Sequence, residues 1–241
     1  MPLLALSVLL SQTPALPKSF DELQTQMRAA QRTRTGIRET WFLVTQVGEA
    51  SQQMRIERGI DGIRGYMFAQ IDGLPVVRLG SDGSKSFFLL YGRSVYAEQS
   101  GANPWITRNP NAELPKLVDG DFNFSADGMY DFLISCKPPL QLKGIEADKL
   151  EDKPVRVATA EAIRPDTKGR VVVQLFFGEK DFILQRATVG MVPEKGDRVT
   201  FRAVRSSLES GVKFEASSFS IPDTRGFQKV EWKALVPGFQ G

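Results

Sequence analysis

Short strand-like segments that recur about every dozen residues constrain this chain more than any other feature. In the first half they lie at 41–47, 53–57, 66–70, 75–79, 86–91 and 94–99. In the second half they lie at 155–160, 170–177, 182–189, 197–204 and 212–221. Segments of this length, rich in β-branched and aromatic residues and separated by short turns, are typical of an antiparallel meander. The sequence therefore predicts a mainly β fold with a small α component.

One helix is predicted ahead of the first strand. Ser19 is followed three residues later by Glu22, which is the spacing of a capping box. Phe20, Leu23 and Met27 then fall on one helical face. We therefore expect a helix with one apolar face at the start of the mature chain.

The stretch from about residue 100 to residue 140 interrupts the meander. It contains Pro104, Pro110 and Pro115, and residues 127–134 favour a short helix. A long excursion of this kind in a single domain is often a lid or a binding loop. The alternative is a plain linker between two halves of the sheet.

The amino-terminal segment has the features of an export signal. Residues 3–10 form an almost unbroken apolar run, which as a helix spans about 12 Å against roughly 30 Å of hydrocarbon in a bilayer. The small residues of Thr13-Pro14-Ala15 follow it at the place of a cleavage site. We predict that residues 1–15 are a secretory signal peptide; the alternative is an amphipathic or buried amino-terminal helix.

The mature chain would then begin near Leu16 and work outside the cytoplasm. Cys136 is the only cysteine, and a chain without a disulfide pair fits a Gram-negative periplasm at least as well as open medium. We predict a periplasmic protein with no transmembrane segment in the mature chain.

Composition favours binding over catalysis. The net charge is +3, too small to indicate a nucleic-acid partner without a clustered basic field. Histidine is absent, which removes the usual general base and the commonest metal ligand. The single cysteine excludes a disulfide framework and a thiolate zinc site within one chain. We therefore expect no enzyme activity, no cofactor and no metal.

A central acidic group is the main catalytic alternative. It consists of Asp119, Asp121, Asp127 and Asp131. Paired carboxylates can hydrolyse glycosides or bind calcium, but Asp119-Gly120-Asp121 lacks the ligand spacing and the terminal Glu of an EF-hand loop. We favour turn and cap roles for these residues; an enzyme that uses carboxylates alone is the alternative.

Three segments, 41–44, 87–91 and 171–177, are apolar on both faces. An antiparallel sheet with one wet face alternates strictly, so something other than the sheet itself must cover these strands. A half-barrel with a helical lid over an apolar ligand satisfies this, and a filled barrel core is the alternative. The candidate lining residues are Trp41, Leu43, Phe87, Leu89, Val172 and Phe176.

Two stretches carry a resemblance to a known family. Residues 77–91 contain a strand, an Asp-Gly turn and an aromatic strand, and Phe219-Ser220-Ile221-Pro222 is followed by Gly226. Together with the order of elements over about residues 19–232, they resemble the periplasmic lipoprotein carriers of the LolA/LolB type and their outer-membrane lipoprotein-sorting relatives. The resemblance implies an antiparallel unclosed β-barrel with a helical lid, formed by residues 16–241 as a single domain.

The resemblance also implies a function. It suggests a protein that binds a lipid or a lipidated protein and carries it within the envelope. Arg58 is the nearest counterpart of an arginine that helps to hold the lid in the family, although Gly59 stands where the family often has proline; the alternative is an exposed arginine at a strand end. The alternative function is an envelope sensor or protein-interaction module of the same fold, without bound lipid, whose loops at 100–125 meet an envelope protein partner.

Overall fold

The computed structural model describes residues 15–32, 36–101, 140–163, 169–192, 194 and 198–235. In these ranges the helices are α1 (Phe20–Arg32), α3 (Trp232–Leu235) and the 3₁₀ turns η1 (Tyr91–Arg93) and η2 (Ala216–Phe219). The strands of the first half are β1 (Ile37–Val47), β2 (Ala50–Asp61), β3 (Arg64–Ile71), β4 (Leu74–Ser81), β5 (Lys85–Leu90) and β6 (Val95–Ser100). Those of the second half are β7 (Gln141–Leu150), β8 (Lys153–Ile163), β9 (Arg170–Gly178), β10 (Leu184–Val192), β11 (Val199–Glu209) and β12 (Gln228–Lys229).

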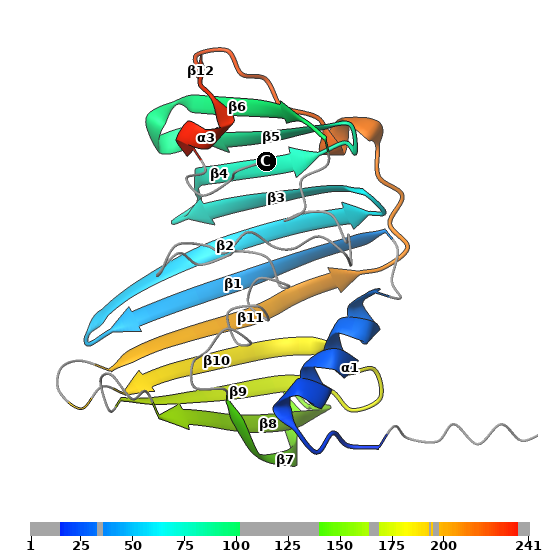
Figure 1. Ribbon diagram of the computed structural model, residues 1–241, viewed down its shortest axis with the longest axis vertical. Coiled ribbons are helices and arrows are strands. Elements are labelled where there is room, and N and C mark those ends of the chain that lie inside the picture. Colours follow the sequence, from blue (N-terminus) through cyan, green and yellow to red (C-terminus); the bar gives the residue numbers. More distant parts are fainter. Residues whose placement is uncertain are drawn as a thin grey trace, which may run out of the picture.

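Within the described ranges these twelve strands form one sheet, in the order β12-β6-β5-β4-β3-β2-β1-β11-β10-β9-β8-β7 (Figure 1). All neighbouring strands are antiparallel except β12, which pairs in parallel with β6 through two residues. The two end strands do not pair with each other, so the sheet stays open. This confirms the predicted fold, which is mainly β, has an unclosed antiparallel sheet and has one helix ahead of the first strand.

Two meanders meet at the centre of the sheet. β1 through β6 pair in succession, as do β7 through β11, and the two series are joined by the pairing of β1 with β11. In that pairing Val47 lies opposite Val199 and Arg38 lies opposite Glu209. The middle of the sheet therefore consists of residues from opposite ends of the chain.

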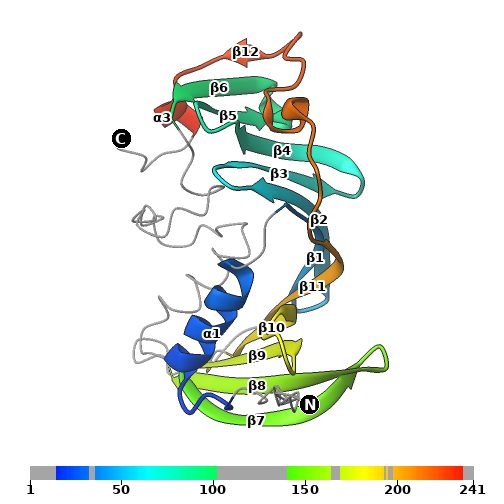
Figure 2. The same ribbon diagram turned by 90° about the vertical axis from the view of Figure 1, so that its right-hand side faces the viewer.

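The curved sheet has two differently covered sides (Figure 2). α1 lies within the curve, beside the β8–β10 part of the sheet, and we call this the concave side. The carboxyl-terminal segment that follows β11 runs along the other side toward β6 and β12, and we call this the convex side. Both sides of a strand are thus available for apolar residues.

α1 is fixed at its start by the predicted cap. The backbone N–H of Glu22 donates to Ser19 Oγ at 3.1 Å, and the N–H of Lys18 donates to Glu22 Oε2 at 2.7 Å. The first bond satisfies a donor that a helix start leaves without a partner, and the second ties the residue before the cap to the first turn. Leu23 and Met27, one turn apart on the same face, are fully buried in the cluster that includes the sheet's concave side.

Three alanines and one leucine form a row across the sheet beside α1. Ala158 of β8 lies opposite Leu175, which in turn lies opposite Ala187 of β10 and then Ala203 of β11. All four are fully buried in the same cluster as Leu23. An alanine projects little above the sheet, so this row allows the helix to approach closely.

The structure differs from the sequence prediction at β7 and at residues 212–221, and it adds the two-residue strand β12, which was not predicted. β7 was not predicted, because its sequence QLKGIEADKL mixes four charged residues with a glycine. It pairs only with β8, and charged residues are common on such edge strands. Residues 212–221, predicted as a strand, form no ladder: they are extended and then enter η2, with Phe219 fully buried.

Several predictions concern residues outside the described ranges. They include the signal peptide at 1–15 except Ala15, nearly all of the excursion at about 100–140, and the short helix at 127–134. These stay predictions.

Candidate ligand-binding face

A continuous apolar floor covers the concave side of the sheet. Beyond the alanine row it continues across β1 to β5 through side chains that belong to one buried cluster with α1. Its members on these strands are Trp41, Ile56, Met67, Ala69, Val77 and Leu79, with Leu43, Met54 and Phe88 partly buried against them. In Figure 2, α1 lies only beside the β8–β10 part, so the floor extends well past the helix.

A buried ion-pair row crosses this floor at β1. Glu39 has no exposed side-chain surface, and its Oε1 lies 2.8 Å from Nε of Arg58 on β2. Its Oε2 lies 3.6 Å from a terminal guanidinium nitrogen of Arg205 on β11. One carboxylate therefore lies between two arginines from the neighbouring strands. Charges so deeply buried are tolerated only when they are paired in this manner.

Strand pairing explains how the row assembles. Glu39 lies opposite Arg58 in the β1–β2 ladder, and the side chains of Ile37, Glu39 and Trp41 point to the same side because a strand alternates. On the other flank the β1–β11 ladder shifts register between Thr40 and Trp41, which places Arg205 directly opposite Trp41. Such bulges re-aim side chains near functional sites.

Trp41 is held by this row. The guanidinium of Arg205 lies 5.3 Å from the centroid of the indole ring, a cation–π contact. Trp41 is 4% exposed, and Leu43 follows on the same side, half-buried and opposite Ala203. The structure therefore brings two of the six candidate lining residues together on the concave floor.

The other four candidates lie on the convex side. Phe87 and Leu89 flank Phe88, which belongs to the concave cluster, so they point the opposite way. Val172 and Phe176 alternate in the same manner with Val171, Val173, Leu175 and Phe177, all of the concave cluster. Phe176 packs instead with Val155 and Val157, and the guanidinium of Arg186 lies 4.6 Å from its ring.

Arg58 is not an exposed arginine at a strand end. It lies inside β2, is 4% exposed, and faces the concave side opposite Met67. Sequence reasoning missed its two partners, Glu39 and Arg205. A signal was available for Glu39. It lies two residues from the apolar Ile37 and two from Trp41, so in a strand all three point to the same side and the sequence placed a charge on the inward face.

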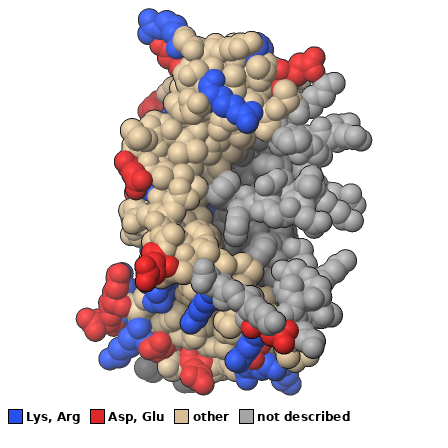
Figure 3. Space-filling model, turned by 90° about the vertical axis from the view of Figure 1, so that its left-hand side faces the viewer, with Lys and Arg blue, Asp and Glu red and all other residues tan. Residues whose placement is uncertain are grey.

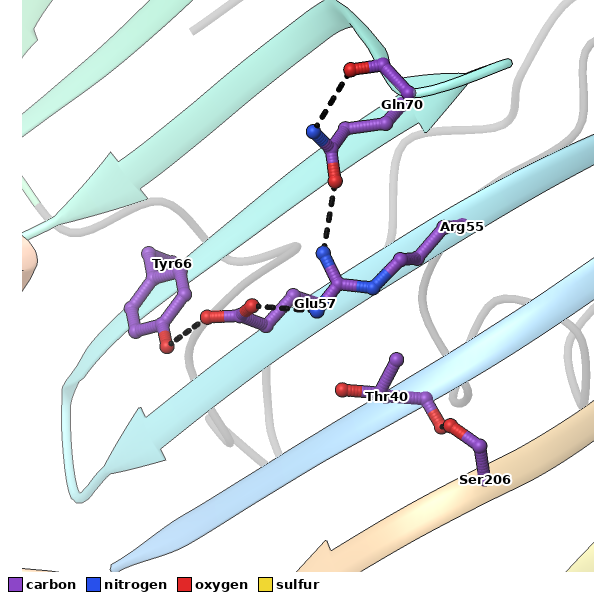
Figure 4. A network of polar contacts seen from close by, with 7 residues as sticks. Thr40, Arg55, Glu57, Tyr66, Gln70 and Ser206 are labelled. Atoms are coloured by element: carbon purple, nitrogen blue, oxygen red, sulfur yellow. Dashed lines mark hydrogen bonds and ion pairs between the residues drawn. The ribbon is translucent and has the colours of Figure 1, made fainter.

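A second polar network lies on the convex side (Figure 4). Tyr66 Oη donates to Glu57 Oε1 at 2.9 Å, and Glu57 Oε2 accepts from Arg55 at 3.1 Å. Arg55 also donates to Gln70 at 2.8 Å. Burial, and then the negative charge of Glu57, raise the pKa of Tyr66 to about 12, against a smaller lowering effect of Arg38.

Aromatic rings of the carboxyl-terminal segment cover this network. The ring of Phe214 lies 6.3 Å from that of Tyr66, edge to face, and the ring of Phe219 lies 6.2 Å from it. Gly59 makes room below, because a Cβ at this position would lie 2.3 Å from the Tyr66 ring. The convex side is thus closed by packing that belongs to the chain itself.

In the view of Figure 3, Lys, Arg, Asp and Glu are densest at the β7–β8 end of the sheet, and fewer of them lie on the surface between the two ends. Among the described residues no group of three or more His, Cys, Asp or Glu is placed to hold a metal ion. Cys136 and the central acidic group lie outside the described ranges.

No helix in the part of the chain that the structure describes is both long and apolar enough to span a bilayer.

No protein-family model matches the sequence, and no curated protein matches it either. Solved structures do match in fold. An uncharacterized conserved protein from Thermus thermophilus is 11% identical with a TM-score of 0.47, over 88% of this chain and 98% of that one. A chain of the Pseudomonas aeruginosa MucA/MucB complex is 13% identical with a TM-score of 0.45, over 87% of this chain and 62%, less than two thirds, of that one. A LolA superfamily protein from Nitrosomonas europaea is 10% identical with a TM-score of 0.36, over 83% and 97%.

We predict that Glu39→Gln destabilises the protein by about 3 kcal/mol or more, because it leaves two buried guanidinium groups without a carboxylate between them. Urea unfolding measures the loss. The matched control is Glu209→Gln, which removes a carboxylate 3.8 Å from Arg38 in a pair that is about half exposed. This exposed pair should contribute less than about 1 kcal/mol. Equal losses for the two variants would contradict a structural role for the buried row.

We predict that the contribution of Tyr66 to stability depends on pH in the alkaline range. Its pKa is about 12 in the folded protein and about 10 in the unfolded chain. The unfolded chain therefore loses this proton first, and the contribution of Tyr66 to stability is complete below pH 10 and disappears as the pH rises toward about 12. The difference in unfolding free energy between the unmodified protein and Tyr66→Phe should shrink over this interval. A difference independent of pH would show that Tyr66 titrates normally.

Proposed function

We propose that this protein is an exported, periplasmic carrier that binds the acyl chains of a lipid or of a lipidated protein on its concave side. The observation that carries the proposal is the apolar floor, which continues from the strands beside α1 across β1 to β5. A floor that served only to pack α1 would end where the helix ends. Its extension offers apolar contacts to a second occupant, which would displace the cover that leaves Trp41, Met67 and Leu79 only 4–5% exposed in the ligand-free protein.

The energetics suit such a ligand. Each buried methylene contributes about 0.8 kcal/mol, so a long acyl chain gains on the order of 10 kcal/mol before the costs of binding are subtracted. This recognition requires no general base and no metal. The absence of histidine from the sequence is therefore compatible with lipid binding.

In the proposed carrier, Arg58 helps to hold the lid over the concave side. It faces the concave side, and its pairing with Glu39 keeps the guanidinium at a fixed position within an otherwise apolar surface. A fixed cation in an apolar surface is a strong hydrogen-bond donor for whatever covers it.

Export is the second part of the proposal and rests on the apolar run at residues 3–10. α1 begins at Phe20, with its cap at Ser19, so cleavage after Ala15 leaves the helix and its cap whole. Exported protein should therefore have a mass that corresponds to residues 16–241.

Native mass spectrometry of the protein purified from a bacterial envelope tests both parts. We expect a chain that begins near Leu16 and carries a stoichiometric acyl-bearing adduct, which solvent extraction removes. A bare mass that also stays unchanged after incubation with lipids and lipopeptides would exclude the carrier and favour a filled-core interaction module. A retained segment 1–15 would contradict export by a cleaved signal.

A substitution pair on one strand locates the binding face. We expect Leu43→Asp to weaken lipid retention about tenfold or more, because it introduces a charge into the concave floor. The control is Val44→Asp, one residue further along β1, which is half-buried on the convex side and should retain lipid. The adduct fraction in native mass spectra, compared between folded variants, is the readout. Equal retention by Leu43→Asp and the unmodified protein would place the ligand elsewhere.

A further inference from the structure

Two buried side chains, one on β1 and one on α1, each carry a hydrogen-bond donor that the described residues leave without an acceptor. One is Nε1 of Trp41 and the other is Nε2 of Gln24. We propose that these two donors bind the ester carbonyl oxygens of a diacyl ligand, so that the site distinguishes an ester-linked from an ether-linked lipid. This inference rests on the proposed function and adds the chemistry by which the ligand's linkage region is recognised.

Trp41 is the better defined of the two. Its indole is 4% exposed, faces the concave side, and lies in the apolar cluster with Ile56 and Met67. The ring is held from one side by the Arg205 guanidinium at 5.3 Å. An indole nitrogen is a donor only, and a buried N–H without an acceptor costs free energy in the ligand-free protein.

Gln24 lies on the apolar face of α1. It is 3% exposed, and it follows Phe20 by four residues and precedes Met27 by three, so the three side chains share one face. Both Phe20 and Met27 belong to the cluster that contains Trp41. A glutamine among such neighbours is expensive unless its polar atoms have partners.

The two donors define the chemistry of the occupant. An apolar surface that offers N–H groups selects a ligand whose buried polar atoms are acceptors and not donors. The ester carbonyls of a diacylglyceryl unit meet this requirement, since they accept hydrogen bonds and join directly to the hydrocarbon. Ether oxygens are weaker acceptors, so a diether of equal chain length should lose these bonds and keep its apolar contacts.

The diacylglyceryl unit can come from a membrane phospholipid or from the acylated cysteine of a lipoprotein. We would compare dipalmitoyl phosphatidylglycerol and a dipalmitoylglyceryl-cysteine lipopeptide, each with its dihexadecyl ether analogue. Displacement of a fluorescent acyl probe from the mature protein gives the affinity of each compound. Whichever ester binds more tightly, the phospholipid or the lipopeptide, identifies the natural source of the diacylglyceryl unit.

We expect the ester to bind about fivefold more tightly than the ether for each hydrogen bond formed. In Trp41→Phe and in Gln24→Met, which remove one donor each at similar size, the ester-to-ether ratio should fall by about that factor. In the double variant it should approach one. Tyr66→Phe is the matched control, because it removes a donor on the convex side, where Tyr66 Oη donates to Glu57, and its ratio should equal that of the unmodified protein.

The outcomes separate the two proposals. Equal binding of ester and ether to the unmodified protein overturns the donor inference and leaves the carrier proposal intact. A ratio that persists in the double variant also overturns it, since other groups would then make the distinction. Failure of all four compounds to displace the probe overturns both. Should Trp41→Phe not fold, the helix variant Gln24→Met decides alone.

Discussion

Alternation of side chains along each strand is the constraint on which the rest of this structure depends. In the paired strands, one set of alternate residues faces the concave side, where α1 lies, and the other set faces the convex side, where the segment that follows β11 runs. A slip of one residue in any ladder would exchange the two sets and bring the glycine-backed aromatics to the helix side. Glycines at 59 and 80, each lying under an aromatic ring, fix the registers because no larger residue fits there.

Glu39 places a buried charge on β1, in the middle of the otherwise apolar floor. Its carboxylate joins β2 to β11 through Arg58 and Arg205, and so connects the two meanders by ions as well as by backbone hydrogen bonds. The same row steadies Trp41. Stability and the candidate binding chemistry therefore depend on one strand, so substitutions that test function need a parallel measurement of folding.

The sequence predicted where strands and helices lie better than it predicted which side of the sheet each side chain faces. Turn residues and β-rich runs indicated the first meander, and the Ser19–Glu22 spacing indicated the start of α1. In a run such as Phe87-Phe88-Leu89-Leu90 both parities are apolar, and only tertiary packing shows that Phe88 alone of the first three joins the concave cluster. Arg205 reaches Trp41 through a register shift that no local pattern announces. Such partners, distant in sequence, are set by the fold as a whole.

The pairing of β1 with β11 has a consequence for the order in which the chain can fold. β1 is made early, but its second neighbour lies near the other end of the chain and becomes available only when almost all of the protein has been made. Until then the first meander has a free edge of eleven residues that can pair with other chains. Long-range contacts of this kind also slow folding. Keeping new copies unfolded or apart until the last long strand arrives limits this hazard.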